Sequence, residues 1–175
     1  MSEMPEQISW PHPNHDVPVD GIYRKLTEIR GHPGYEPPFT VVKRRILDER
    51  EGSESQFEAT VLVKIKGKND LVIATGSGRG PISSLEIALR KALIPYFPSI
   101  GKIMGMHCVS HTLPNSVEGL HADTQTIIHL KCVDTERRFS VRRVAISEPG
   151  ACEAILVDVY ELWALVETRA EELHS

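Results

Sequence analysis

The residues of this sequence whose types and spacing are best suited to chemistry form one glycine-rich run, ATGSGRGP at Ala74–Pro81. An apolar segment, Leu71–Ile73, precedes the run, and a helical pattern that starts at Ile82 follows it. Glycines in front of a helix bring backbone N–H groups to its positive end, where an anionic group is readily bound. The run therefore predicts contact with an anion. The competing interpretation is a strand-to-helix turn whose glycines supply positive φ.

The spacing of the run argues against the common phosphate-binding motifs. It lacks the Gly-Lys-Ser/Thr ending of a P-loop. Its third glycine falls one residue too early for a dinucleotide fingerprint, and no parallel βαβ pattern surrounds it. A nucleotide cofactor is therefore not expected.

The remaining reactive side chains predict neither a metal site nor a catalytic site. His107 and His111 share one side of an expected strand with Cys108 opposite, and a third ligand at a suitable spacing is missing. No serine or cysteine stands in a nucleophile elbow. The basic clusters at 43–45 and 137–143 are interpreted as surface charge. We expect no metal, no cofactor and no catalytic residue.

Composition narrows the class of protein. The chain has 175 residues, of which 41% are hydrophobic and 25% charged, as in soluble globular proteins. A formal net charge of −4 argues against nucleic acid as the main partner. No apolar run is long enough to span a membrane, and the polar N-terminus lacks the features of a secretory signal. Three widely spaced cysteines suit reduced thiols. We expect a cytoplasmic protein with no membrane partner.

The elements that must position the glycine run follow one order twice. Residues 1–38 are rich in proline and predict an arm or linker with one short helix at Val19–Ile29. From Phe39 the pattern predicts three strands and a helix in each of two units, about 39–98 and 103–173. The expected strands are 39–47, 57–66 and 71–75, then 104–112, 124–133 and 139–146, and the expected helices are 82–93 and 151–173. The fold class is α+β, with duplicated βββα units whose antiparallel sheets pack against helices in one module, 39–175.

With this order and the run GRGPISSLEIAL at 78–89 in view, the chain resembles the C-terminal regulatory domain of 2-isopropylmalate synthase and citramalate synthase. The family signature is Gly-x-Gly-Pro-[apolar]-Asp-Ala-x-x-x-Ala-Leu, and the resemblance covers about residues 39–170. Ser83 and Ser84 replace the aspartate and alanine of the signature. Gly105-Met106 stands where the family often has Asp-Tyr, and the second unit has no Gly-x-Gly at 145–150.

The resemblance implies a function in regulation. In that family the domain dimerises and binds the end product of branched-chain amino-acid biosynthesis, such as leucine, at the subunit interface, and this inhibits a separate catalytic barrel. The ligand would meet backbone N–H groups and apolar side chains. Carried over by position, the ligand-binding residues are Gly78, Arg79, Gly80, Ile82 and Ser83, with Ile103 and Met106 as weaker candidates.

The same resemblance implies that the chain is not itself an enzyme. The catalytic part of the family is a TIM barrel of about 250 residues, with a metal held by an aspartate and a His-x-His pair, and this sequence has neither. We expect a homodimer, which is either a stand-alone homologue of the regulatory domain or one polypeptide of a split synthase with a separate catalytic subunit.

Two other interpretations remain open. One is an adaptor or dimerisation module that has lost its ligand. The other is a double-stranded-RNA-binding module, which also has a βββα order and a glycine-rich turn. Such modules place lysines at the start of the last helix. Here that place holds Ser83–Glu86, and the first cation is Arg90.

Overall fold

The computed structural model describes residues 20–113, 123–133, 136 and 138–172. It is an α+β structure with two three-stranded antiparallel sheets and three α-helices. The elements in chain order are α1 (Asp20–Arg30), β1 (Phe39–Glu51), β2 (Glu54–Ile65), β3 (Leu71–Gly78), α2 (Pro81–Leu93), a 3-10 helix η1 (Pro98–Lys102), β4 (Ile103–Thr112), β5 (Thr124–Cys132), β6 (Arg138–Ala145) and α3 (Glu148–Glu172).

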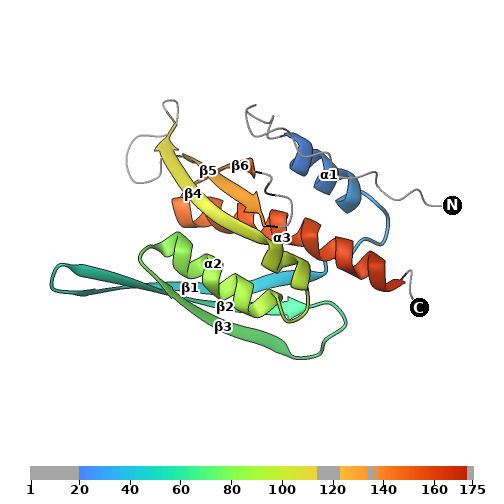
Figure 1. Cartoon of the computed structure of the whole chain (residues 1–175), viewed down its shortest axis with the longest axis horizontal. Coiled ribbons are helices and arrows are strands. Elements are labelled where there is room, and N and C mark those ends of the chain that lie inside the picture. Colours follow the sequence, from blue (N-terminus) through green and yellow to red (C-terminus); the bar gives the residue numbers. More distant parts are fainter. Residues whose placement is uncertain (1–19, 114–122, 134–135, 137, 173–175) are drawn as a thin grey trace.

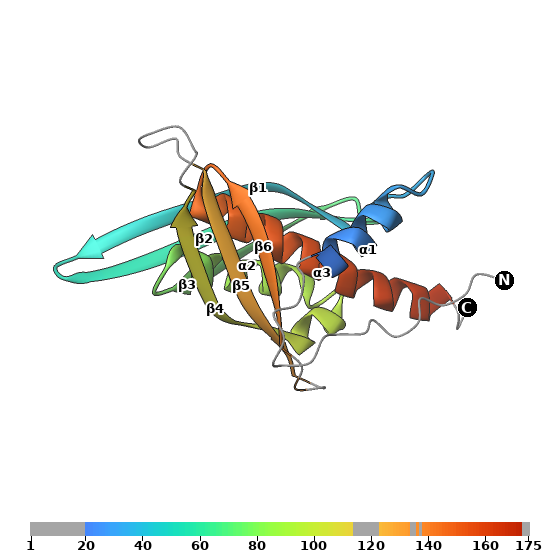
Figure 2. The same ribbon diagram turned by 90° about the horizontal axis from the view of Figure 1, so that it is seen from above.

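The two sheets enclose the two long helices. Strands follow the order β1-β2-β3 in one sheet and β4-β5-β6 in the other. Helix α2 lies on the first sheet and α3 on the second, and both helices occupy the layer between the sheets in two perpendicular views (Figures 1 and 2). The short helix α1 lies against α3. Each sheet therefore has one face on the core and one face outward.

Hydrophobic periodicity explains these layers. In β2, alternate residues are fully or almost fully buried, which is the period of a strand with one covered face. In α2 the buried residues recur at helical spacing, and Pro81 occupies the first turn, where its missing N–H costs nothing. Most of α3 up to Ala164 is buried, because that helix has the second sheet on one side and α2 on another. One continuous core results.

The first half of the chain, β1–α2, and the second half, β4–α3, share a strand irregularity and a spacing of buried helix residues as well as the order of their elements. In each half the first strand has an irregularity in its pairing at its fourth residue, Val42 in β1 and Met106 in β4. The helices carry buried pairs of neighbouring residues at the same spacing. These pairs are Ser84–Leu85, Ala88–Leu89 and Ala92–Leu93 in α2, and Ala151–Cys152, Ile155–Leu156 and Val159–Tyr160 in α3.

Most predicted elements are present, with different lengths. The helix expected at Val19–Ile29 is α1, and the strands and helices of the later segments lie where the sequence places them. The connection between the expected strands 39–47 and 57–66 is shorter than predicted, because β1 ends at Glu51 and β2 begins at Glu54. The two strands form a long hairpin that projects from the body (Figure 2). Helix η1 was not predicted. Residues 1–19 of the expected arm, and residues 114–122 between the expected strands 104–112 and 124–133, lie outside the described residues.

Two polar side chains of α2 form hydrogen bonds to the segment that connects the first half of the chain to the second. Arg90 donates hydrogen bonds to the carbonyls of Ile100 (3.3 Å), Gly101 (3.2 Å) and Ile103. Glu86 accepts a hydrogen bond from the N–H of Gly105 at 3.0 Å. Helix α2 therefore fixes both the end of η1 and the start of β4.

Candidate functional site

The glycine-rich run divides between a strand and a helix start. Strand β3 continues through Gly78, so Gly76 and Gly78 are strand residues. Neither they nor Gly80 has positive φ, and Gly80 is extended at φ −152°. The interpretation of the run as a turn that needs positive φ is therefore wrong for these three glycines.

Close packing explains two of the glycines. A Cβ added at Gly76 would lie 2.5 Å from the backbone N of Ala88 and 2.5 Å from the carbonyl O of Ser84. One added at Gly78 would lie against the Oγ of Ser83 and 2.9 Å from the backbone N of Ser84. Such distances are far inside van der Waals contact, so α2 can approach β3 only where the strand has no side chain. A Cβ at Gly80 would meet nothing within 4 Å. Only the third glycine is free of this packing requirement.

The start of α2 is capped by its own serines. Gly80 is the N-cap residue, and its N–H donates to the Oγ of Ser83 at 3.2 Å. The N–H of Ser84 donates to the carbonyl of Gly80 at 3.1 Å, and the Oγ of Ser84 donates to the carbonyl of Pro81 at 2.9 Å. The backbone donor of Gly80 is thus used locally, as in one half of a capping box.

The predicted ligand-binding residues divide into a group at this helix start and two residues elsewhere. Gly78 and Arg79 line an open groove of about 1240 Å³ beside the β1–β2 hairpin. Ile82 is partly buried and packs against the core. Ile103 is completely buried in that core, whereas Met106 is 48% exposed at the irregularity in β4. Gly78–Ser83 are adjacent in the chain and form the candidate site; Ile103 lies in the core in this monomer.

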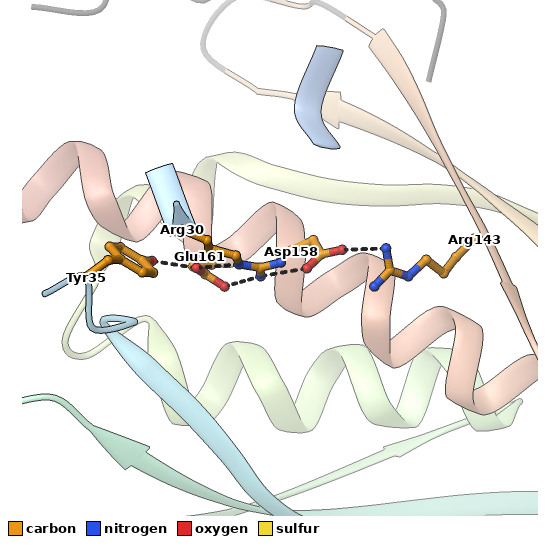
Figure 3. A network of polar contacts seen from close by, with 5 residues as sticks. All are labelled: Arg30, Tyr35, Arg143, Asp158 and Glu161. Atoms are coloured by element: carbon orange, nitrogen blue, oxygen red, sulfur yellow. Dashed lines mark hydrogen bonds and ion pairs between the residues drawn. The ribbon is translucent and has the colours of Figure 1, made fainter. Parts of the chain in front are cut away.

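A second polar site, which the sequence analysis missed, joins α1 to α3 (Figure 3). Arg30 at the end of α1 donates two hydrogen bonds to Glu161 (3.1 and 2.5 Å) and one to Asp158 (2.8 Å). The hydroxyl of Tyr35 donates to Glu161 at 2.5 Å, and Arg143 of β6 lies 3.6 Å from the Oδ2 of Asp158. Both carboxylates are buried, with 3% of each residue exposed. We call these five residues the α1–α3 network.

The network shifts the ionisation of its members. The hydrogen bonds to Glu161 raise the pKa of the Arg30 guanidinium above its usual range, although burial acts against this. Burial raises the pKa of the Tyr35 phenol, and its hydrogen bond to Glu161 adds to the effect. Arg30 therefore stays charged and Tyr35 stays protonated over the usual range of pH.

The raised pKa of Tyr35 predicts a loss of stability at alkaline pH. The unfolded chain loses the phenol proton near pH 10, whereas the folded chain keeps it, so this contribution is present below about pH 10 and is lost as the pH rises further. Tyr35→Phe should make the fall in unfolding free energy between about pH 9 and 11 less steep. The measurement is urea denaturation across that range. Tyr96→Phe at an exposed position is the control, and a Tyr35→Phe profile as steep as that of the wild type would contradict the prediction.

An open groove of about 730 Å³ lies beside this network. The segment before β1, the first part of β1, and α3 form its walls, and Arg143 of β6 reaches it. We call it the α1–α3 groove. Its charged residues are Arg30, Arg44, Arg143, Glu153, Asp158 and Glu161, and its other lining residues include Phe39, Val41, Ala154 and Val157.

Other chemistry is not supported by the described residues. They contain no group of three or more His, Cys, Asp or Glu side chains placed to hold a metal ion. The three cysteines are free, and burial raises the pKa of both Cys108 and Cys152, whose sulfurs lie 3.9 Å apart. Thiols with a raised pKa are poor nucleophiles. None of the helices in the described part of the chain is long and apolar enough to cross a membrane.

Comparison with known proteins finds sequence similarity to (R)-citramalate synthases. No family model matches the sequence. Over 125 residues, 70% of this chain and 23% of the relative, the sequence is 30% identical to (R)-citramalate synthase of Geobacter sulfurreducens. Over 60 residues, 34% of this chain and 11% of the relative, it is 35% identical to (R)-citramalate synthase of Streptomyces coelicolor. The chain thus spans less than a quarter of the length of these relatives. It is weakly homologous to (R)-citramalate synthase over about 70% of its own length.

Proposed function

We propose that this chain is a regulatory module of the citramalate and 2-isopropylmalate synthase family, linked to branched-chain amino-acid biosynthesis, and that it binds leucine or a similar small amino acid. The observation that carries the proposal is the homology to (R)-citramalate synthase, which is restricted to 23% of the length of that enzyme. The described residues form two antiparallel sheets, whereas a catalytic TIM barrel consists of parallel strands. The activity we assign to the module is therefore binding and not catalysis.

We further propose that the module arose by duplication of a βββα unit. The irregularity at the fourth residue of both β1 and β4 supports this, as does the matching spacing of buried pairs in α2 and α3. Independent units would have little reason to share an irregularity at the same strand position.

The effector site in this proposal is the start of α2, at Gly78, Arg79, Gly80, Ile82 and Ser83. The positive end of the helix attracts a carboxylate, and Arg79 is exposed beside the groove. Met106, which lies beside Gly105 and its hydrogen bond to Glu86 of α2, stays a weaker candidate. The exposed apolar residues of both sheets are consistent with a homodimer that completes the site, and a separate catalytic subunit would receive the signal.

Ligand binding gives the experiment for this proposal. Leucine at about one hundred times its Kd would stabilise the folded chain by about 2.7 kcal/mol and raise its melting temperature. In amide NMR spectra the signals of residues 78–83 should move when leucine, isoleucine or valine is added. No shift in these signals at millimolar concentrations of all three amino acids would favour the adaptor that has lost its ligand, for which the local capping by Ser83 is an argument.

Gly80→Val is the variant that tests the site. Because a Cβ at Gly80 meets nothing within 4 Å, the variant should fold with nearly unchanged stability. The valine side chain would cover the helix start, so the leucine-dependent shifts of residues 78–83 should disappear. Arg79→Gln, which removes one charge and little volume, should weaken the same response. Unchanged shifts in Gly80→Val would show that the ligand does not bind at this helix start.

A further inference from the structure

Two cysteines lie in contact within the second half of the chain. Cys108 is on β4 and Cys152 is near the start of α3, and their sulfurs are 3.9 Å apart. Both are free thiols. A disulfide bond joins its sulfurs at about 2.05 Å, so the two sulfurs need to approach by about 2 Å, a movement that rotation about side-chain bonds can provide. The two thiols are therefore placed for direct joining.

The two thiols differ in their access to solvent. Cys152 is completely buried, whereas Cys108 is partly exposed on a strand at the edge of its sheet. A small oxidant can therefore reach Cys108 directly. The third thiol, Cys132, is paired with Ile103 at the other end of the same strand pair, four residues along β5 from the partner of Cys108. At about 3.3 Å per residue, Cys132 is too far along the strand to join this pair.

We propose that Cys108 and Cys152 form a reversible oxidation site, and that hydroperoxides such as hydrogen peroxide are its class of oxidant. The Cys108 thiolate attacks one peroxide oxygen, so that an S–O bond forms, the O–O bond breaks, and hydroxide leaves and takes up the proton that Cys108 gave. The Cys152 thiolate then attacks the sulfur of this sulfenic acid. An S–S bond forms, the S–O bond breaks, and the second hydroxide takes up the proton from Cys152. Two thiols and one hydrogen peroxide thus give one disulfide and two waters.

The surroundings of the two thiols determine how this site responds. Burial raises the pKa of both Cys108 and Cys152, so little thiolate is present at neutral pH and the first step is slow. The contact between the sulfurs has the opposite effect on the second step, because the sulfenic acid already lies beside a thiol. Oxidation therefore stops at the reversible disulfide and does not continue to the irreversible sulfinic acid. Such a site responds to sustained oxidation.

The disulfide would attach an edge strand to the long helix. Strand β4 is hydrogen-bonded to β5 alone in its sheet, and α3 packs mainly against β5 and β6. A bond between Cys108 and Cys152 adds a direct link from β4 to α3, and it closes the long loop 108–152, which constrains the unfolded chain. Oxidation should therefore stabilise the fold. Residues 78–83 take no part in this, so the inference does not depend on the proposed effector site.

Peptide mapping of the full chain after treatment with hydrogen peroxide under native conditions tests the site. Trypsin places the cysteines on three different peptides, 103–131, 132–137 and 144–169. We expect a disulfide between 103–131 and 144–169, a free thiol at Cys132, and loss of the disulfide in dithiothreitol. A disulfide to Cys132, sulfinic acid at Cys108 without a disulfide, or unreacted thiols after prolonged exposure to millimolar peroxide would overturn the inference.

Single alanine variants separate the roles of the thiols. In Cys108→Ala the other thiol of the pair should stay reduced, because Cys152 is completely buried. In Cys152→Ala, Cys108 should react and continue to sulfinic acid, because the thiol that ends the reaction is missing. Cys132→Ala is the matched control and should form the disulfide as the wild type does. Oxidation of Cys152 at the wild-type rate in Cys108→Ala would contradict the order of attack. If a variant does not fold, the peptide map of the wild-type chain decides.

The rate of oxidation and the melting temperature provide two further measurements. Disulfide formation should be about tenfold faster at pH 8 than at pH 7, since the thiolate fraction rises by that factor while the pH stays below the pKa. The oxidised chain should melt about 5 °C or more above the reduced chain, and dithiothreitol should abolish this difference. A rate that is independent of pH, or an oxidised chain that melts no higher than the reduced one, would count against a disulfide formed within this fold.

Discussion

Replacing Gly76 by valine should destabilise the folded chain by about 3 kcal/mol or more, or prevent folding altogether. The new Cβ alone would lie 2.5 Å from two backbone atoms of α2, the N of Ala88 and the carbonyl O of Ser84. Backbone atoms inside a helix cannot move aside as a flexible side chain can, so α2 would have to withdraw from β3. That withdrawal would also open the core beneath Leu85 and Leu89, both completely buried.

The matched control for this variant lies in the same run of sequence. Gly80→Ala adds the same first carbon where nothing lies within 4 Å, at a residue with ordinary extended backbone. Urea denaturation followed by circular dichroism should give nearly wild-type stability for Gly80→Ala and a large loss for Gly76→Val. Equal stability of the two variants would mean that α2 and β3 do not approach each other as described.

This contrast shows what the sequence could predict about the glycine run. The alternation of glycines, the following proline and the helical pattern predicted the passage from a strand to a helix, but β3 continues through Gly78 and so includes part of the run. They could not tell which glycines serve packing, because that depends on how closely α2 crosses β3, a distance that no local pattern encodes. Gly76 and Gly78 serve packing, whereas Gly80 has no such packing requirement.

The α1–α3 network could not be predicted from the sequence, for a related reason. Asp158 and Glu161 do stand within the apolar pattern of α3, which is the one sequence signal for buried carboxylates that need partners. Their main partner, Arg30, lies more than a hundred residues away in the sequence, in a segment interpreted as arm or linker. Local patterns predicted the strands and helices well, but pairing between distant charges depends on tertiary packing.

Arg30→Met should destabilise the chain by about 2–3 kcal/mol at neutral pH. The methionine fills part of the same volume, but Glu161 loses its guanidinium partner and Asp158 loses the donor to its Oδ1. Removing one member of a buried ion pair leaves an uncompensated charge, which typically costs about 3–5 kcal/mol. We expect a smaller cost for Arg30→Met, because the Arg30 side chain is 40% exposed and water therefore screens part of its interaction with the two carboxylates.

The pH dependence separates this electrostatic cost from a loss of packing. An unpaired buried carboxylate binds a proton more readily in the folded than in the unfolded chain, so lowering the pH should stabilise the folded variant relative to the wild type. The difference in unfolding free energy between Arg30→Met and wild type should therefore shrink from about pH 7 to about pH 4. A difference that is independent of pH would instead assign the cost to lost packing of α1.

The control for Arg30→Met is a variant that removes one positive charge from an ion pair on the surface. Lys66 lies 3.6 Å from Glu36, and both side chains are more than half exposed. Such pairs contribute about 0–1 kcal/mol, so Lys66→Met should have little effect at either pH. A large effect of Arg30→Met beside a small effect of Lys66→Met would show that the ion pairs of Arg30 with the two buried carboxylates help to hold α1 on α3. Helix α1 would then belong to the folded module that forms the α1–α3 groove, and a fragment that begins at Phe39 would lose one wall of it.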